Sequence, residues 1–116
     1  MNAEEFVAAI HNVVIEPMAA DITSMLHRPP GRQPASELVE LSTWHDGLAD
    51  SDQLMIKRVI ALAARNSVFG VFAVLDGARK VDSKGTANDY FELRYVHKTS
   101  EDVLSGPKGA LLHELL

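Results

Sequence analysis

The stretch from Val68 to Gly77 constrains the fold of this chain more than any other. It reads Val-Phe-Gly-Val-Phe-Ala-Val-Leu-Asp-Gly, so eight apolar or glycine positions precede a turn signal. Because no polar residue interrupts the run, we expect it to form the buried centre of the domain. Phenylalanine and valine favour a strand, but nothing at Asn66-Ser67 demands a break. We therefore favour a helix that continues to about Leu75, with Gly77 as its cap, over a strand.

The composition is typical of a single globular domain spanning residues 1–116. Hydrophobic residues make up 47% of the chain and charged residues 23%, and cysteine is absent, which excludes a disulfide scaffold. Acidic residues follow Met1 where a secretory signal would be basic, and no apolar run approaches the roughly 20 residues that span a bilayer. These features predict a soluble cytoplasmic protein that does not contact a membrane.

The first 27 residues carry apolar residues at helical spacing, interrupted by Pro17. The proline ring would clash with the carbonyl of Val13, so we expect two helices, over about 3–15 and 17–27. A single kinked helix is the alternative. The segment from Arg28 to Pro34 cannot be helix or inner strand, and we expect a stiff basic connector there.

Two further helices are expected before Gly77. The third runs from Pro34 to about Asp46, with Gly47 as a left-handed C-terminal cap. The segment from Asp50 to Gln53 resembles a capping box that opens the fourth helix, with Asp50 accepting a hydrogen bond from a backbone amide. The spacing predicts that the third helix turns the following residues inward: Leu38, Leu41, Trp44, His45 and Leu48.

The periodicity changes after Gly77. Residues Tyr90 to Val96 alternate as in a strand, Arg79–Asp82 could pair with it, and Val103-Leu104 could add a third. Residues 110–116 predict a short helix whose Leu111, Leu112 and Leu115 dock onto the helical core. The fold class expected is therefore α+β and mainly helical: about four N-terminal helices, a short antiparallel β-hairpin or meander, and a small C-terminal helix.

The sequence contains no recognisable reaction centre. Nucleophile-elbow and phosphate-loop motifs are absent, and the five histidines share no metal-binding spacing. The pair His45-Asp46 comes nearest to a catalytic dyad, but adjacent helical residues diverge, which favours a surface or capping role. We expect no enzyme activity, no catalytic residue, no cofactor and no metal. The alternative is a small ligand-binding or enzymatic domain that uses Asp76, Arg79, Asp82 and Arg94.

Charge is distributed unevenly along the chain. Residues 1–50 carry eight acidic and two basic residues, whereas residues 51–116 carry eight acidic and nine basic residues. An acidic half repels nucleic acid and attracts basic proteins, although a merely solvated face is the alternative. Trp44 is either a core anchor, which its spacing favours, or a half-exposed binding residue. The candidate partner-binding residues are Glu37, Glu40, Asp46, Asp50 and Asp52, together with Tyr90, Glu92 and Arg94 near the predicted hairpin.

Four short motifs occur in order along the chain: Pro29-Pro30-Gly31-Arg32, Leu41-Ser42-Thr43-Trp44, Phe69-Gly70 running to Asp76-Gly77, and Leu112-His113-Glu114-Leu115. In these motifs the chain resembles small bacterial immunity proteins of polymorphic or secretion-delivered toxin systems. The resemblance implies a protein without enzyme activity that binds a cognate toxin domain, usually over the toxin's active site. It transfers no catalytic residue. A homo-oligomer is compatible with it, and a helical adaptor is a further alternative.

Overall fold

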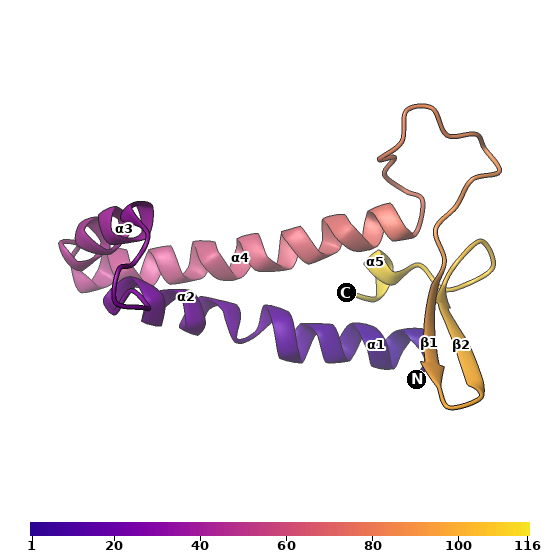
Figure 1. The fold of residues 1–116 in the computed structure, drawn as a ribbon, viewed down its shortest axis with the longest axis horizontal. Helices are drawn as coiled ribbons and strands as arrows, with labels where there is room; N and C mark the ends of the chain where they lie inside the picture. The colour runs from indigo at the N-terminus through magenta and orange to yellow at the C-terminus, as the bar shows by residue number, and fades with distance from the viewer.

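A computed structural model describes all residues from 1 to 116, and its shape is an elongated rod (Figure 1). An N-terminal arm of α1 (Ala3–Ile10), η1 (His11–Ile15) and α2 (Met18–His27) runs antiparallel to the long helix α4 (Asp50–Leu75). Helix α3 (Ser36–Asp46) closes one end of the rod. Strands β1 (Leu93–His97) and β2 (Ser100–Ser105) and helix α5 (Leu112–Leu115) lie at the other end. This arrangement confirms the mainly helical α+β fold.

The N-terminal arm is continuous, but it widens into one π-helical turn before Pro17. Asn2 and Glu5 form a capping box that starts α1, and the amide of Glu16 then bonds the carbonyl of His11 at 2.9 Å. Proline has no amide hydrogen, so the carbonyl four residues before it loses its usual partner. A π turn accommodates such a break inside a helix. The arm therefore combines the two expected alternatives: the α-helix is interrupted next to Pro17, yet the segments before and after it form one kinked helical arm.

The expected caps between α3 and α4 are wrong. Ala49 is the N-cap of α4, and Asp50 makes no capping hydrogen bond. The Gln53 side chain instead donates to the carbonyls of His45 and Leu48 across the turn. Gly47 has φ −80°, so the chain leaves α3 in a right-handed conformation. The cap predicted after α4 is confirmed, because Gly77 has φ +77°.

Helix α3 is rotated relative to the expected inner face: His45 is buried as expected and Leu38 and Leu48 are half-buried, but the other two residues expected there are exposed. Leu41 and Trp44 are 46% and 54% exposed, whereas Ser42 and His45 are buried. The Ser42 hydroxyl donates to the carbonyl of Leu26, the penultimate residue of α2. A carbonyl at the end of a helix lacks an intrahelical partner, so burying Ser42 against it satisfies a hydrogen bond. Because Ser42 occupies the inner side of α3, Trp44 is left exposed to solvent.

The apolar core is small and lies where α1, α4 and α5 meet. Val7, Phe72 and Leu112 form its buried centre, and only 11 of 116 residues are buried in the whole chain. The stretch Val68–Leu75 is helical, as favoured, and supplies Phe72 to this core. The expectation that the whole stretch is buried is wrong, because Phe69 and Val71 are exposed. The elements that contact α4 cover only one of its sides, so residues on its other side stay exposed.

The sheet is a single antiparallel pair, with His97 opposite Ser100 and a bulge next to Leu93. The Val103-Leu104 strand is confirmed as part of β2, but the other strand begins at Leu93 rather than Tyr90. Arg79–Asp82 forms no strand, contrary to expectation. The carboxylates of Asp82 and Asp89 accept backbone amides within this loop, so local turns replace a ladder.

Two helices are long and apolar enough to cross a bilayer by length and composition alone, Ala3–His27 and Asp50–Leu75. The sequence-based prediction that no segment is long and apolar enough to span a bilayer is therefore wrong. Such helices are weak grounds for a membrane protein, since core helices and signal sequences also meet these criteria.

Candidate functional site

A stripe of large apolar side chains along α4 is largely uncovered by the rest of the chain. Met55, Val59, Leu62 and Phe69 are 53%, 59%, 59% and 40% exposed. Their spacing of four, three and seven residues places them on one side of the helix, with Asn66 at the skipped position. Of these four apolar residues, Phe69 also contacts α5, with its ring centroid 5.5 Å from that of His113. We call Met55, Val59, Leu62 and Phe69 the outer face of α4.

A second apolar stripe on α4 faces the rest of the molecule. Ile56, Ile60, Ala64 and Val68 are half-buried, and Phe72 is buried. Helix α4 contacts α2, η1 and α5 in the structure. The N-terminal arm thus covers only one of two apolar sides. A surface helix normally carries a single apolar stripe, so the exposed outer face of α4 calls for a partner.

The overall dimensions agree with an incompletely covered structure. The radius of gyration is 18.5 Å and the extents are 51 × 35 × 30 Å. A compact domain of this length would have a radius of gyration of about 13 Å. The chain therefore leaves much of its apolar side-chain surface in contact with solvent.

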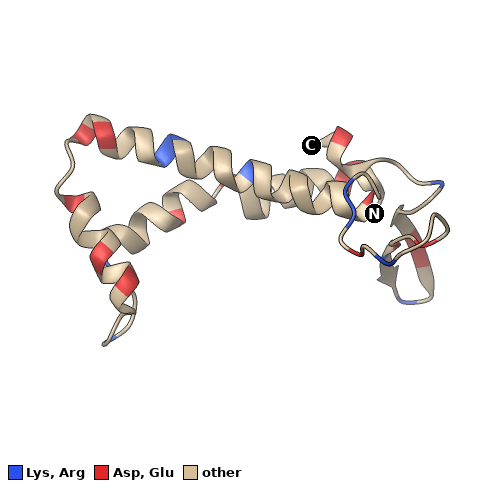
Figure 2. Cartoon of the chain, turned by 90° about the horizontal axis from the view of Figure 1, so that it is seen from above, with Lys and Arg blue, Asp and Glu red and all other residues tan.

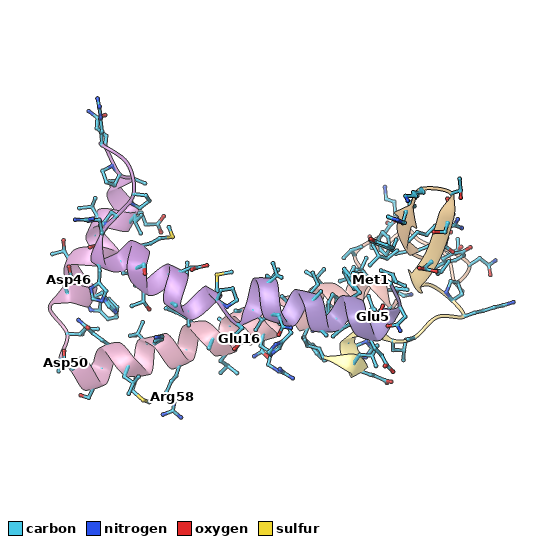
Figure 3. The ribbon with its side chains drawn as sticks, turned by 90° about the horizontal axis from the view of Figure 1, so that it is seen from below. Met1, Glu5, Glu16, Asp46, Asp50 and Arg58 are labelled. Atoms are coloured by element: carbon cyan, nitrogen blue, oxygen red, sulfur yellow. The ribbon has the colours of Figure 1, made fainter.

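The acidic partner-binding candidates gather at one end of the rod, around the turn between α3 and α4 (Figure 2). All five are exposed, and Figure 3 shows Asp46 and Asp50 at the end far from Met1. The Oδ1 atom of Asp46 is 3.1 Å from Nδ1 of His27, whereas the Asp50 side chain makes no capping hydrogen bond. Exposed Trp44 belongs to the same end. We call this surface the acidic end: Glu37, Glu40, Trp44, Asp46, Asp50 and Asp52.

The remaining candidates Tyr90, Glu92 and Arg94 lie at the opposite end, beside the hairpin (Figure 1). Arg94 pairs with Glu92 and also with Glu101, 2.6 Å away on β2. These two carboxylates, Glu92 foremost, raise the pKa of Arg94. The structure therefore does not bring the eight candidates into one site. It forms two separate surfaces, and the ion pairs satisfy the charges of the second.

A buried carboxylate lies at the end of α4, and its structural role was not predicted from the sequence. Asp76 has no exposed side-chain surface; its Oδ1 accepts from the Ser105 hydroxyl at 3.0 Å and its Oδ2 accepts from the His113 amide at 2.9 Å. The His113 ring nitrogen Nδ1 is 2.7 Å from the same oxygen. Burial raises the pKa of Asp76, but the hydrogen bonds from His113, Leu112 and Ser105 outweigh it and hold the pKa below its ordinary value.

A cavity of about 540 Å³ opens beside this carboxylate, between the end of α4 and the loop that follows. Asp76, Arg79 and Asp82 line it together with Tyr90, but Arg94 does not. Of the four residues considered for an enzymatic or ligand-binding site, three therefore lie together and Arg94 lies apart. Asp76 is occupied by Ser105 and His113, and Asp82 accepts the amide of Lys84. These hydrogen bonds let both carboxylates hold the chain in place.

The histidines are distributed differently from the sequence-based expectation. His45 is 1% exposed, which confirms the inward position predicted from the helical spacing and shows that the surface role also considered for it is wrong. Its ring lies 5.3 Å from that of His27, centroid to centroid, although 18 positions separate the two. No metal-binding spacing signals this pair, because the contact depends on how α3 folds back over α2.

Comparison with known proteins identifies no relative. No family model, no curated protein and no solved structure matches the chain.

Proposed function

We propose that this protein binds another protein through the outer face of α4 and neutralises it by covering its working surface, as immunity proteins do with toxins. The observation that carries the proposal is the outer face of α4, which the chain itself leaves largely uncovered. Apolar residues at four- and three-residue spacing are the pattern with which one helix packs against another element. The motif resemblance to immunity proteins supplies the class of partner.

A protein partner fits this surface better than a lipid bilayer does. The apolar segments carry charges along their length, including Glu16 and Asp21 on the arm and Arg58 and Arg65 on α4. Figure 3 shows Arg58 projecting from α4 away from the N-terminal arm. A charged residue near the middle of a membrane span costs about 2.5–3.5 kcal/mol. At an interface with another protein, these arginines can pair with carboxylates or stay hydrated, so this cost does not arise.

The acidic end adds a means of selecting the partner. Its carboxylates would attract a basic surface, as in a toxin that acts on nucleic acid, and would speed the first encounter. Exposed Trp44 and Leu41 lie among these acids on α3. Tryptophan is enriched among the residues that contribute most to protein–protein affinity. The acidic end and the outer face share α4, so one partner could contact both.

The proposal is tested with Val59→Glu/Leu62→Glu, which places two charges in the outer face. The matched control is Val13→Glu/Val103→Glu, which charges two exposed valines on the arm and on β2. Each protein is purified from its native cells, and the stoichiometry of the retained partner is measured. We expect the parent and the control to retain one partner protein in a one-to-one complex and the Val59/Leu62 variant to lose it.

A second readout separates neutralisation from simple binding. Cells that express the retained partner are tested for growth with each variant. We expect the parent and the control to protect and the Val59/Leu62 variant to fail. Retention of the partner without protection would indicate an adaptor, and equal behaviour of all three proteins would place the interface elsewhere. Sedimentation of the parent with phospholipid vesicles, abolished by the same variant, would show a lipid-binding face instead.

A further inference from the structure

We propose that His27, His45 and Asp46 form a binding site for a divalent transition-metal ion of the zinc class. One ring nitrogen from each histidine and one carboxylate oxygen of Asp46 all lie within 4.8 Å of one another. The Asp46 Oδ1 atom is 3.1 Å from Nδ1 of His27 and 3.9 Å from Nδ1 of His45. Three ligand atoms thus converge at the junction of α2 and α3, a site separate from the outer face of α4.

The strongest indication is an unpaired nitrogen. Nδ1 of His45 is buried without a hydrogen-bond partner, and it is the only side-chain nitrogen or oxygen in the chain of which this is true. Leaving a buried polar atom unpaired costs about 1–3 kcal/mol. The carboxylate of Asp46 is its nearest charged neighbour, yet at 3.9 Å it is too far to accept a hydrogen bond. A metal ion between the two groups would satisfy both.

The surrounding contacts hold the ligands in position. The Ser42 hydroxyl bonds the carbonyl of Leu26, which fixes the end of α2 just before His27. The Gln53 side chain donates to the carbonyl of His45 at 3.0 Å, so α4 anchors the backbone of the second ligand. Metal ligands in proteins are commonly oriented by such outer contacts.

The donor set selects the kind of ion. Zinc binds imidazole nitrogen and carboxylate oxygen at about 2.0–2.2 Å, which places ligands of a tetrahedral ion roughly 3.3 Å apart. The 3.1 and 3.9 Å separations lie close to this value, and the two histidine nitrogens, which lie within 4.8 Å of each other, would have to approach on binding. Two imidazoles disfavour Mg²⁺ and Ca²⁺, which prefer oxygen ligands throughout. Three protein ligands leave the fourth position to water.

The test is calorimetric titration of the full chain with Zn²⁺, comparing the parent with His27→Asn and Asp46→Asn. Both side chains are about half exposed, so these variants should fold as the parent does. The matched control is His11→Asn, since His11 contacts Glu16 at 3.8 Å without a third ligand. We expect one Zn²⁺ per chain for the parent and the control, and at least a tenfold lower affinity in each ligand variant, because loss of even an outer contact costs about 10–100-fold.

A second measurement addresses His45, whose replacement could disturb folding. The visible absorption spectrum of Co²⁺ bound to the parent should show tetrahedral coordination, and Zn²⁺ should displace it. The proposal would be overturned if the parent binds no Zn²⁺, if His27→Asn and Asp46→Asn bind as the parent does, or if His11→Asn lowers the affinity equally.

Discussion

At the residue scale, Asp76 shows how one side chain connects parts of the chain that are distant in sequence. It ends α4 as the C-cap residue, and its carboxylate accepts the amide of His113 in the first turn of α5. A helix start lacks partners for its first amides and favours a negative charge. Asp76 therefore acts as the capping residue of a helix 37 positions away, which holds the C-terminal tail against α4.

We predict that Asp76→Asn lowers the free energy of unfolding by about 2–3 kcal/mol, since hydrogen bonds to a buried charged group contribute more than neutral ones. Chemical denaturation measures the change. Asp82→Asn is the control, because Asp82 is exposed and bonds only within its own turn. A similar loss in both variants would contradict the capping role.

The same carboxylate predicts a pH dependence. Its pKa lies below the ordinary value of 3.8 in the folded protein, so the ionised form stabilises the fold. This contribution is complete above the unfolded pKa and is lost as the pH falls through the folded pKa. The stability difference between the parent and Asp76→Asn, followed from pH 5 downward, should shrink below about pH 4. A difference that widens on acidification would show that the folded pKa is raised.

Sequence reasoning found some of these residues and missed what they do. Asp76 was expected to follow the end of the helix, and it does, because the Asp-Gly pair gives a local signal. Its partners Ser105 and His113 lie far along the chain and carry no local signal. The same holds for His27 and His45, whose contact exists only because Ser42 turns α3 over the end of α2.

At the scale of elements, periodicity predicted that α4 is a helix but not which of its sides is covered. Both stripes are apolar at helical spacing, and only the three-dimensional packing shows that Ile56, Ile60 and Phe72 face inward. For α3, the spacing of Leu41 and Trp44 pointed to the wrong side. A periodic pattern specifies a face, whereas burial also requires a neighbour to cover it.

The C-terminal helix gives the clearest test of packing. Leu112 is fully buried against Val7 and Phe72, while Leu111 and Leu115 remain exposed, so docking of all three leucines is only partly correct. We predict that Leu112→Ala lowers the free energy of unfolding by about 2–5 kcal/mol, as for other core leucines. Leu115→Ala is the matched control and should cost under about 1 kcal/mol. Equal melting temperatures for the two variants would show that the tail is undocked.

At the scale of the whole molecule, the charges are sorted along the rod. The acidic end lies around the α3–α4 turn, and paired charges occupy the hairpin end (Figure 2). We predict that Glu40→Lys/Asp52→Lys slows association with the protein partner, with a smaller effect at high salt. Stopped-flow mixing measures the rate. Glu4→Lys/Glu114→Lys, which reverses two exposed acids on α1 and α5, should leave it nearly unchanged.

We propose that α4 keeps its outer face bare until a different protein covers it. Small-angle X-ray scattering of the free protein tests this most directly, because one curve gives both the mass and the radius of gyration. We predict the mass of one 12.7 kDa chain and a radius of gyration near 18.5 Å. A single chain with a radius of gyration of about 13 Å, as expected for a compact domain, would mean that the protein covers the face itself. A doubled mass would mean that a second copy does.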